Sequence, residues 1–125
     1  MKRLTIAAFA VAGVAFMPAA AVADGPQAIG VATNHAGLAS MAGNIDMVHT
    51  HLHHVLNCLV GAGGQGFDQA KGNPCGGSGP AIPQTADAAT KTKLEMVAAN
   101  VRAGTTNPDI EASKKVASDA AAALK

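Results

Sequence analysis

The chain has 125 residues, with nine basic and eight acidic side chains and a formal net charge of +1 at pH 7. Nucleic acids and anionic membranes recruit proteins with a basic surplus, so this near-neutral balance argues against both as partners. A chain of this length suits one domain with a modest core.

The N-terminus has the three parts of an export signal. Lys2 and Arg3 precede an uncharged apolar run over residues 4–17, which is shorter than the about 20 residues that a membrane span needs. The Ala-Val-Ala of residues 21–23 matches the small-x-small pattern that signal peptidase cleaves, here before Asp24. An uncleaved membrane anchor is the alternative.

We therefore predict a signal peptide over residues 1–23 and a single helical domain over residues 24–125. The protein would be periplasmic or secreted, without membrane attachment after cleavage. Cleavage removes two basic residues and leaves a net charge of −1, and Phe67 becomes the only aromatic residue. The core must then be built from aliphatic side chains and much alanine, which buries little area per residue.

The chain has four segments with helical periodicity, and none that alternates convincingly like a strand. The first helix is expected over residues 26–41. The second begins after Asn44, a favourable N-cap, carries Asp46 in its first turn, and ends at Gly61. One face of the first helix would be formed by Ile29, Ala32, Ala36 and Ala39. The second has the strongest apolar periodicity, at Ile45, Val48, Leu52, Val55, Leu56 and Leu59.

Residues 61–83 are rich in glycine and contain three prolines, so we expect a long loop without regular structure. Cys58 ends the second helix and Cys75 lies in this loop. In an oxidising compartment this pair predicts a disulfide that tethers the loop, with two thiolate metal ligands as the alternative. We expect Phe67 to insert into the core. The GAGGQG segment follows a helix rather than a strand, which argues against a nucleotide site.

Two more helices are expected after the loop. Thr85 is the predicted N-cap of a helix that runs to Arg102, and Asn107 is the predicted N-cap of the next, with Pro108 at its first position. Their inward residues would be Leu94, Val97, Ala98, Val101, Ile110, Ala117, Ala120, Ala121 and Leu124. The pattern predicts an all-α protein, a small four-helix bundle of two helical hairpins joined by the Gly-rich loop.

All five histidines lie between residues 35 and 54, and four of them lie on the second helix. At 100° per residue, these four form two groups that flank the apolar stripe. The first candidate metal site contains Asp46, His49 and His53, in which two imidazoles at i and i+4 share one face and the carboxylate supplies or orients a ligand.

The second candidate metal site contains Met47, His51 and His54, with Cys58 added if it is reduced. Soft sulfur favours Cu(I), and imidazole suits both copper oxidation states. If the first two helices form an antiparallel hairpin about Gly43, His35 reaches the level of His51 and adds a ligand from another element.

These patterns predict a protein that binds copper first and zinc second, and that buffers, delivers or sequesters the metal. Haem is the alternative ligand, with His51 or His49 paired with Met96 or Met41, although the scarcity of aromatic residues counts against it. A different class of function is a structural or interaction protein whose His-rich helix contacts a protein partner. We expect no enzymatic activity, because no catalytic constellation is readable; a reactive Cys58 beside His54 is the one candidate.

The segments HLHHVLNCLVG, GFD and NPC, roughly residues 49–75, carry a resemblance to other proteins. At these segments the chain resembles small exported bacterial helical proteins of undefined function. In general character it is also similar to soluble periplasmic copper carriers, although the residues do not match their better-known motifs. The first resemblance implies export and supplies no activity or site residue.

Overall fold

The computed structural model describes residues 25–125, and the regular structure in this range is entirely helical. The all-α class predicted from the sequence is therefore confirmed. The predicted signal peptide, residues 1–23, lies outside the described residues. None of the helices described is long and apolar enough to cross a membrane.

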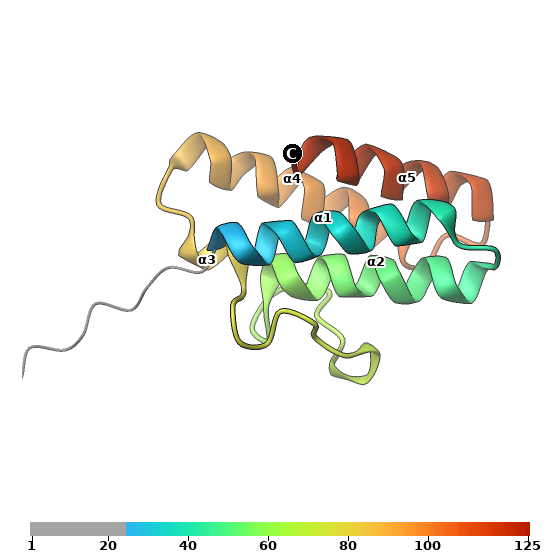
Figure 1. Cartoon of the computed structure of the whole chain (residues 1–125), viewed down its shortest axis with the longest axis horizontal. Helices are drawn as coiled ribbons and strands as arrows, with labels where there is room; N and C mark the ends of the chain where they lie inside the picture. Colours follow the sequence, from blue (N-terminus) through green and yellow to red (C-terminus); the bar gives the residue numbers. More distant parts are fainter. Residues whose placement is uncertain (1–24) are drawn as a thin grey trace, which may run out of the picture.

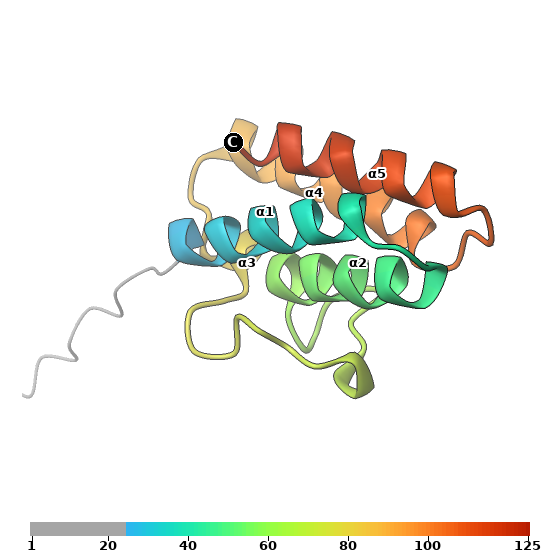
Figure 2. The same cartoon turned by 45° about the vertical axis from the view of Figure 1, so that its right-hand side comes forward.

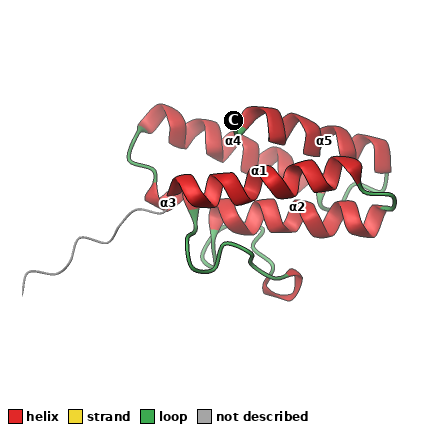
Figure 3. Cartoon of the chain, in the orientation of Figure 1, coloured by secondary structure: helices red, strands yellow, loops and turns green. Residues whose placement is uncertain are grey.

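Four long helices lie side by side as a helical bundle (Figures 1 and 2). Their bounds are α1 Gly25–Met41, α2 Ile45–Val60, α4 Ala88–Gly104 and α5 Ile110–Ala123. The helix α1 packs against both α2 and α5, and α4 packs against both α2 and α5. Residues 61–87 connect the two hairpins along the outer side of α2 (Figure 3). This connection contains a short 3-10 helix, η1 Gln69–Lys71, and a single helical turn, α3 Ala81–Gln84.

The hairpin of α1 and α2 has the bounds expected from its local sequence signals. Asn44 caps α2, and its Oδ1 accepts a hydrogen bond from the Met47 N–H at 2.9 Å. Gly61 ends α2 with a φ of +70°, and its N–H donates to the Asn57 carbonyl. A β-carbon at Gly61 would also collide with Pro80, so only glycine fits this position.

The N-cap of α4 is Asp87 rather than Thr85 as predicted. The Asp87 carboxylate accepts from the Thr90 N–H at 2.8 Å. The Thr85 hydroxyl, directly after α3, instead donates to the carbonyl of Ala81, the first residue of that turn. Because both residue types cap helices well, the outcome depends on which one the preceding turn leaves free.

The predicted cap of α5 was also wrong by two residues. Asp109, rather than Asn107, is the N-cap, and its Oδ1 accepts from the N–H groups of Glu111 and Ala112. The Asn107 side chain accepts from the Asp109 N–H at 2.9 Å and so forms the turn that precedes the helix. Asn107 therefore forms the turn before α5, and Asp109 caps the first turn of the helix.

Small side chains dominate the core. The buried face of α1 consists of Gly25, Ala28, Ala32, Ala36 and Ala39. Facing it, α2 buries Val48, Leu52, Val55, Leu56 and Leu59, while Ile45 and Ile29 are only half-buried. Because alanine keeps the side-chain layer thin, α1 can lie close to its neighbours.

Phe67 is half-buried and does not join the core cluster, so its predicted insertion into the core was wrong. The loop that carries it runs along the outer side of α2, whereas the core lies between the long helices (Figure 1). The Cys58–Cys75 disulfide is present, and both cysteines are buried. Cys58 therefore supplies no thiolate to the second candidate metal site.

Substituting Gly104 should test how closely α4 packs. A β-carbon at this position would lie 3.0 Å from both Leu52 Cδ1 and Val116 Cγ1, so Gly104→Ala should lower the free energy of unfolding by about 1–3 kcal/mol. The control is Gly30→Ala on α1, where a β-carbon meets nothing within 4 Å. That variant should gain about 0.5–1 kcal/mol from helix propensity. Urea unfolding measures both changes, and a Gly104→Ala protein as stable as wild type would contradict the packing described.

Candidate metal centre

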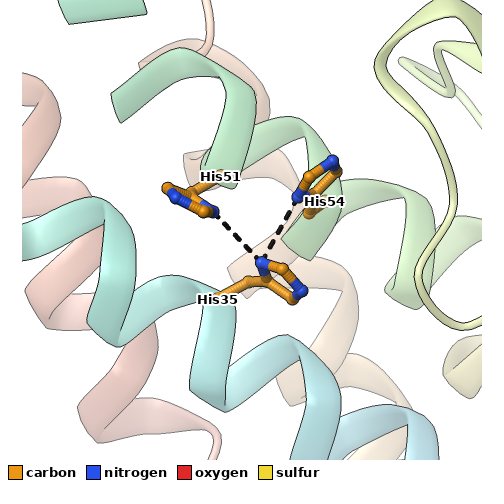
Figure 4. Close-up of side chains that lie close together, drawn as sticks. All are labelled: His35, His51 and His54. Carbon is orange, nitrogen blue, oxygen red and sulfur yellow. Dashed lines mark hydrogen bonds between the residues drawn. The ribbon is translucent and has the colours of Figure 1, made fainter. Parts of the chain in front are cut away.

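Three histidines from two helices point toward one another at the surface of the bundle (Figure 4). His35 comes from α1, and His51 and His54 come from α2, where a spacing of three residues puts them on one face. One ring nitrogen of each histidine lies within 4.8 Å of a ring nitrogen of the other two. All three side chains are half-buried. The hairpin thus brings His35 to the level of His51, as its sequence position indicated.

The shortest distances in this group join the Nδ1 atoms. His35 Nδ1 lies 3.1 Å from His51 Nδ1 and 3.3 Å from His54 Nδ1. The ring centroids of the three histidines are 4.7–5.7 Å apart, with His54 edge-on to the other two. His35 Nδ1 is therefore the nitrogen around which the group is arranged.

The protonation of His54 follows from its outer contact. His54 Nε2 lies 2.7 Å from the carbonyl oxygen of Lys71 in η1. A carbonyl oxygen only accepts, so this nitrogen carries the proton, and in a neutral ring Nδ1 then presents a lone pair. The lone pair faces the group, and the bond to the loop holds the ring in that orientation.

The three Nδ1 atoms cannot all be paired in hydrogen bonds with one another while the rings are neutral. If His35 Nδ1 carries a proton, that proton serves one neighbour well and must be shared with the other. If His35 Nδ1 has no proton, its lone pair opposes that of His54 at 3.3 Å. At most one of the two contacts is thus a well-formed hydrogen bond between neutral rings. A cation among the three nitrogens would satisfy all of the lone pairs together.

The environment keeps two of these rings neutral. Burial lowers the pKa of His35 to about 4, and the proximity of His54 and His51 contributes further. The pKa of His51 is also lowered, first by burial and then by His54. Neutral imidazole is the form that binds metal, so both rings are in their ligand state at pH 7.

The other predicted site residues do not form a second group of this kind. Asp46 is exposed, and His49 Nε2 lies 2.8 Å from the Asn107 carbonyl in the turn before α5. His53 has a buried Nδ1 without a hydrogen-bond partner, and its pKa is lowered chiefly by burial, which outweighs the opposing effect of Asp68. Among residues 25–125, only His35, His51 and His54 meet as three metal-ligating side chains.

The methionines lie at the periphery. Met47 precedes His51 by one helical turn on α2 and is 49% exposed. Met41 and Met96, the methionines considered as haem ligands, are 73% and 59% exposed. Their exposure places both side chains on the protein surface rather than in a pocket for a large planar ligand.

One contributor to the site was not predicted. The Lys71 carbonyl orients His54, but a backbone oxygen in an irregular loop has no signature in residue type. Asn57 provided an indirect signal, because a polar residue close to the apolar stripe of α2 must find hydrogen-bond partners from another segment. The structure shows that this segment is the loop that carries Lys71.

Acidification should destabilise the metal-free protein. The pKa of His35 is about 4 in the folded chain, against an ordinary value of 6.5, so between these two values the unfolded chain binds a proton that the folded chain does not. The free energy of unfolding is therefore highest above pH 6.5, where His35 is neutral in both states, and it falls as the pH decreases toward 4. Urea unfolding across this range should show the decline, and it should be shallower in His35→Gln. An equal slope in the two proteins would contradict the lowered pKa of His35.

No protein-family model, no curated protein and no solved structure matches the chain. The chemistry of the three histidines therefore has to be interpreted from their distances, their burial and their hydrogen bonds.

Proposed function

We propose that the protein binds one transition-metal ion through the Nδ1 atoms of His35, His51 and His54. The observation that carries this proposal is the convergence of the three nitrogens, with two separations of 3.1 and 3.3 Å. Ligand nitrogens about 2.0–2.1 Å from a tetrahedral ion lie about 3.4 Å from one another. The two printed separations are thus within a few tenths of an ångström of this spacing, and the ligand nitrogens of His51 and His54 lie within 4.8 Å of each other.

The contact of His54 with the loop supports the same conclusion. Histidines that ligate metals commonly donate their other ring N–H to a carbonyl or carboxylate, which orients the ring and raises its basicity. His54 Nε2 makes such a bond to the Lys71 carbonyl at 2.7 Å. With this nitrogen protonated, Nδ1 is the only atom of the ring that can bind a metal.

Copper is the first choice of metal, and zinc the second. Imidazole suits both ions, and the Met47 thioether, one turn before His51 and half-exposed, is a soft donor that favours Cu(I). Three protein nitrogens leave a coordination position open, unlike a closed structural zinc site. An open position permits the ion to be exchanged, which suits buffering, delivery or sequestration more than a purely structural role.

We place this function outside the cytoplasm. The signal-like sequence of residues 1–23 supports export to the periplasm or beyond, and the Cys58–Cys75 disulfide suits an oxidising compartment. In this proposal the mature protein is a four-helix bundle with the Gly-rich loop tethered by the disulfide. The metal would sit between α1 and α2, beside η1 of that loop.

Haem has less support than a metal ion. A cavity of about 770 Å³ lies between the end of α2, the residues around α3 and α4, but neither histidine nor methionine lines it. The histidines that converge do so at 4.7–5.7 Å between ring centroids, which suits a single ion rather than a macrocycle. A protein partner that contacts the His-rich helix remains the alternative from another class of function.

Metal titration of paired variants tests the proposal. The purified protein, produced without a histidine tag, should bind one equivalent of Cu or Zn in competition with a chromophoric chelator. His51→Ala combined with His54→Ala should weaken binding by more than about 100-fold, because losing ligands costs more than losing the groups that orient them. The His49→Ala and His53→Ala pair is the matched control on the same helix, and it should leave the affinity nearly unchanged.

Two outcomes would refute this assignment. A wild-type protein that binds neither metal at micromolar concentration would rule out the proposed function. A protein that loses its metal through the His49 and His53 substitutions, but keeps it without His51 and His54, would place the site on the other side of α2. Elemental analysis and an absorption spectrum of the same sample distinguish copper, zinc and haem, since haem would show a Soret band.

A further inference from the structure

Asn57 is a fully buried polar residue on α2, one turn after His54. Burying an amide is costly unless its donors and acceptors are paired. Every partner of the Asn57 side chain comes from the backbone of one short loop segment. Its Nδ2 donates to the carbonyls of Asp68 at 2.8 Å and Gly72 at 2.6 Å, and its Oδ1 accepts from the Asp68 N–H at 3.0 Å.

These three bonds hold both ends of η1. Asp68 is the N-cap of this 3-10 turn and Gly72 is its C-cap. Within the turn, the Lys71 N–H donates to the Asp68 carbonyl and the Gly72 N–H donates to the Gln69 carbonyl. Gly72 has a φ of +84°, a conformation that glycine adopts without strain. The segment between the two clamped residues therefore has one well-defined path.

The Lys71 carbonyl lies between these two residues and accepts a hydrogen bond from the His54 Nε2–H at 2.7 Å. Asn57 fixes the next residue, Gly72, through its carbonyl, and so limits how the peptide between Lys71 and Gly72 can turn. One short path of contacts thus runs from Asn57 through the loop to the ring of His54. It begins and ends on α2, one helical turn apart.

We propose that Asn57 is a positioning residue for the metal centre and acts through the Lys71 carbonyl. It holds this oxygen where it keeps His54 Nε2 protonated and directs Nδ1 toward His35. This inference rests on the proposed metal-binding function, and Asn57 itself does not touch the ion. An amide is needed because two of the groups it meets are carbonyl oxygens, to which a carboxylate could not donate.

Three variants separate positioning from general stability. Asn57→Leu keeps a similar volume in α2 but releases the loop, whose carbonyls can then bond to water. Gly72→Ala leaves Asn57 intact and disturbs the same peptide, because a β-carbon is strained at a φ of +84°. The added β-carbon would lie 3.7 Å from His54 Nε2, an ordinary contact, so it does not itself displace the ring. Asn73→Ala is the matched control: Asn73 lies in the same loop, but its side chain accepts from the Cys75 N–H and has no link to Lys71.

Each variant is measured in two ways. The first is the exchange rate of the His54 Nε2–H with water, read by NMR on the metal-free protein. The second is the affinity for Zn in competition with a chelator. In Asn57→Leu and Gly72→Ala the proton signal should exchange rapidly, and the affinity should fall by about tenfold to hundredfold, the usual effect of losing a group that orients a metal ligand. Asn73→Ala should match wild type in both measurements.

The outcomes distinguish this inference from the proposed function. If wild type, Asn57→Leu and Gly72→Ala all bind Zn equally well, the positioning role is refuted while the proposed metal site stands. If wild type binds neither Zn nor Cu, the proposed function fails, and the role of Asn57 fails with it. Should Asn57→Leu not fold, Gly72→Ala still tests the step on which the role of Asn57 depends, because its substitution lies outside the helical core and changes the path of the loop at Lys71. An unchanged His54 proton signal and Zn affinity in that variant would refute positioning through the Lys71 carbonyl.

Discussion

The close packing of α1 against α2 is the constraint on which the candidate site depends. Alanine at positions 28, 32, 36 and 39 of α1 is fully buried, so the backbones of the two helices approach closely. The short turn at residues 42–44 fixes their antiparallel register (Figure 1). A slip of one helical turn would move His35 by about 5.4 Å along α2, which is more than its present distance from either partner nitrogen.

The loop between the hairpins adds the second constraint. A segment so rich in glycine cannot hold one conformation through its own hydrogen bonds, and here two anchors on α2 supply the order. The Cys58–Cys75 disulfide fixes one point, and Asn57 fixes both ends of η1. These anchors, Asn57 and Cys58, are adjacent residues of α2, one helical turn after His54. The site is therefore completed by a backbone oxygen held through side chains that are not themselves ligands.

Local signals predicted the helices well but placed two helix starts wrongly. The bounds of α2 follow from Asn44 and Gly61, and both were predicted correctly. Before α4 and α5, two capping residues lie two positions apart, and the residue nearer the helix, Asp87 or Asp109, is the cap. A competition between neighbouring caps depends on the turn that precedes them. Here the competing residue is engaged by a local hydrogen bond, Thr85 with the Ala81 carbonyl and Asn107 with the Asp109 N–H.

The sequence by itself determined the all-helical class, the limits of the first hairpin, the pairing of the two cysteines, and the division of the α2 histidines into two groups. These features depend on residue type and on a period of 3.6 residues, both of which are local. Only the tertiary structure decided which histidine group meets further donors. His51 and His54 face His35 on α1, whereas His49 faces a carbonyl before α5. The outcome depends on how helices distant in the chain pack, and on a loop carbonyl whose direction cannot be read from the residue type of Lys71.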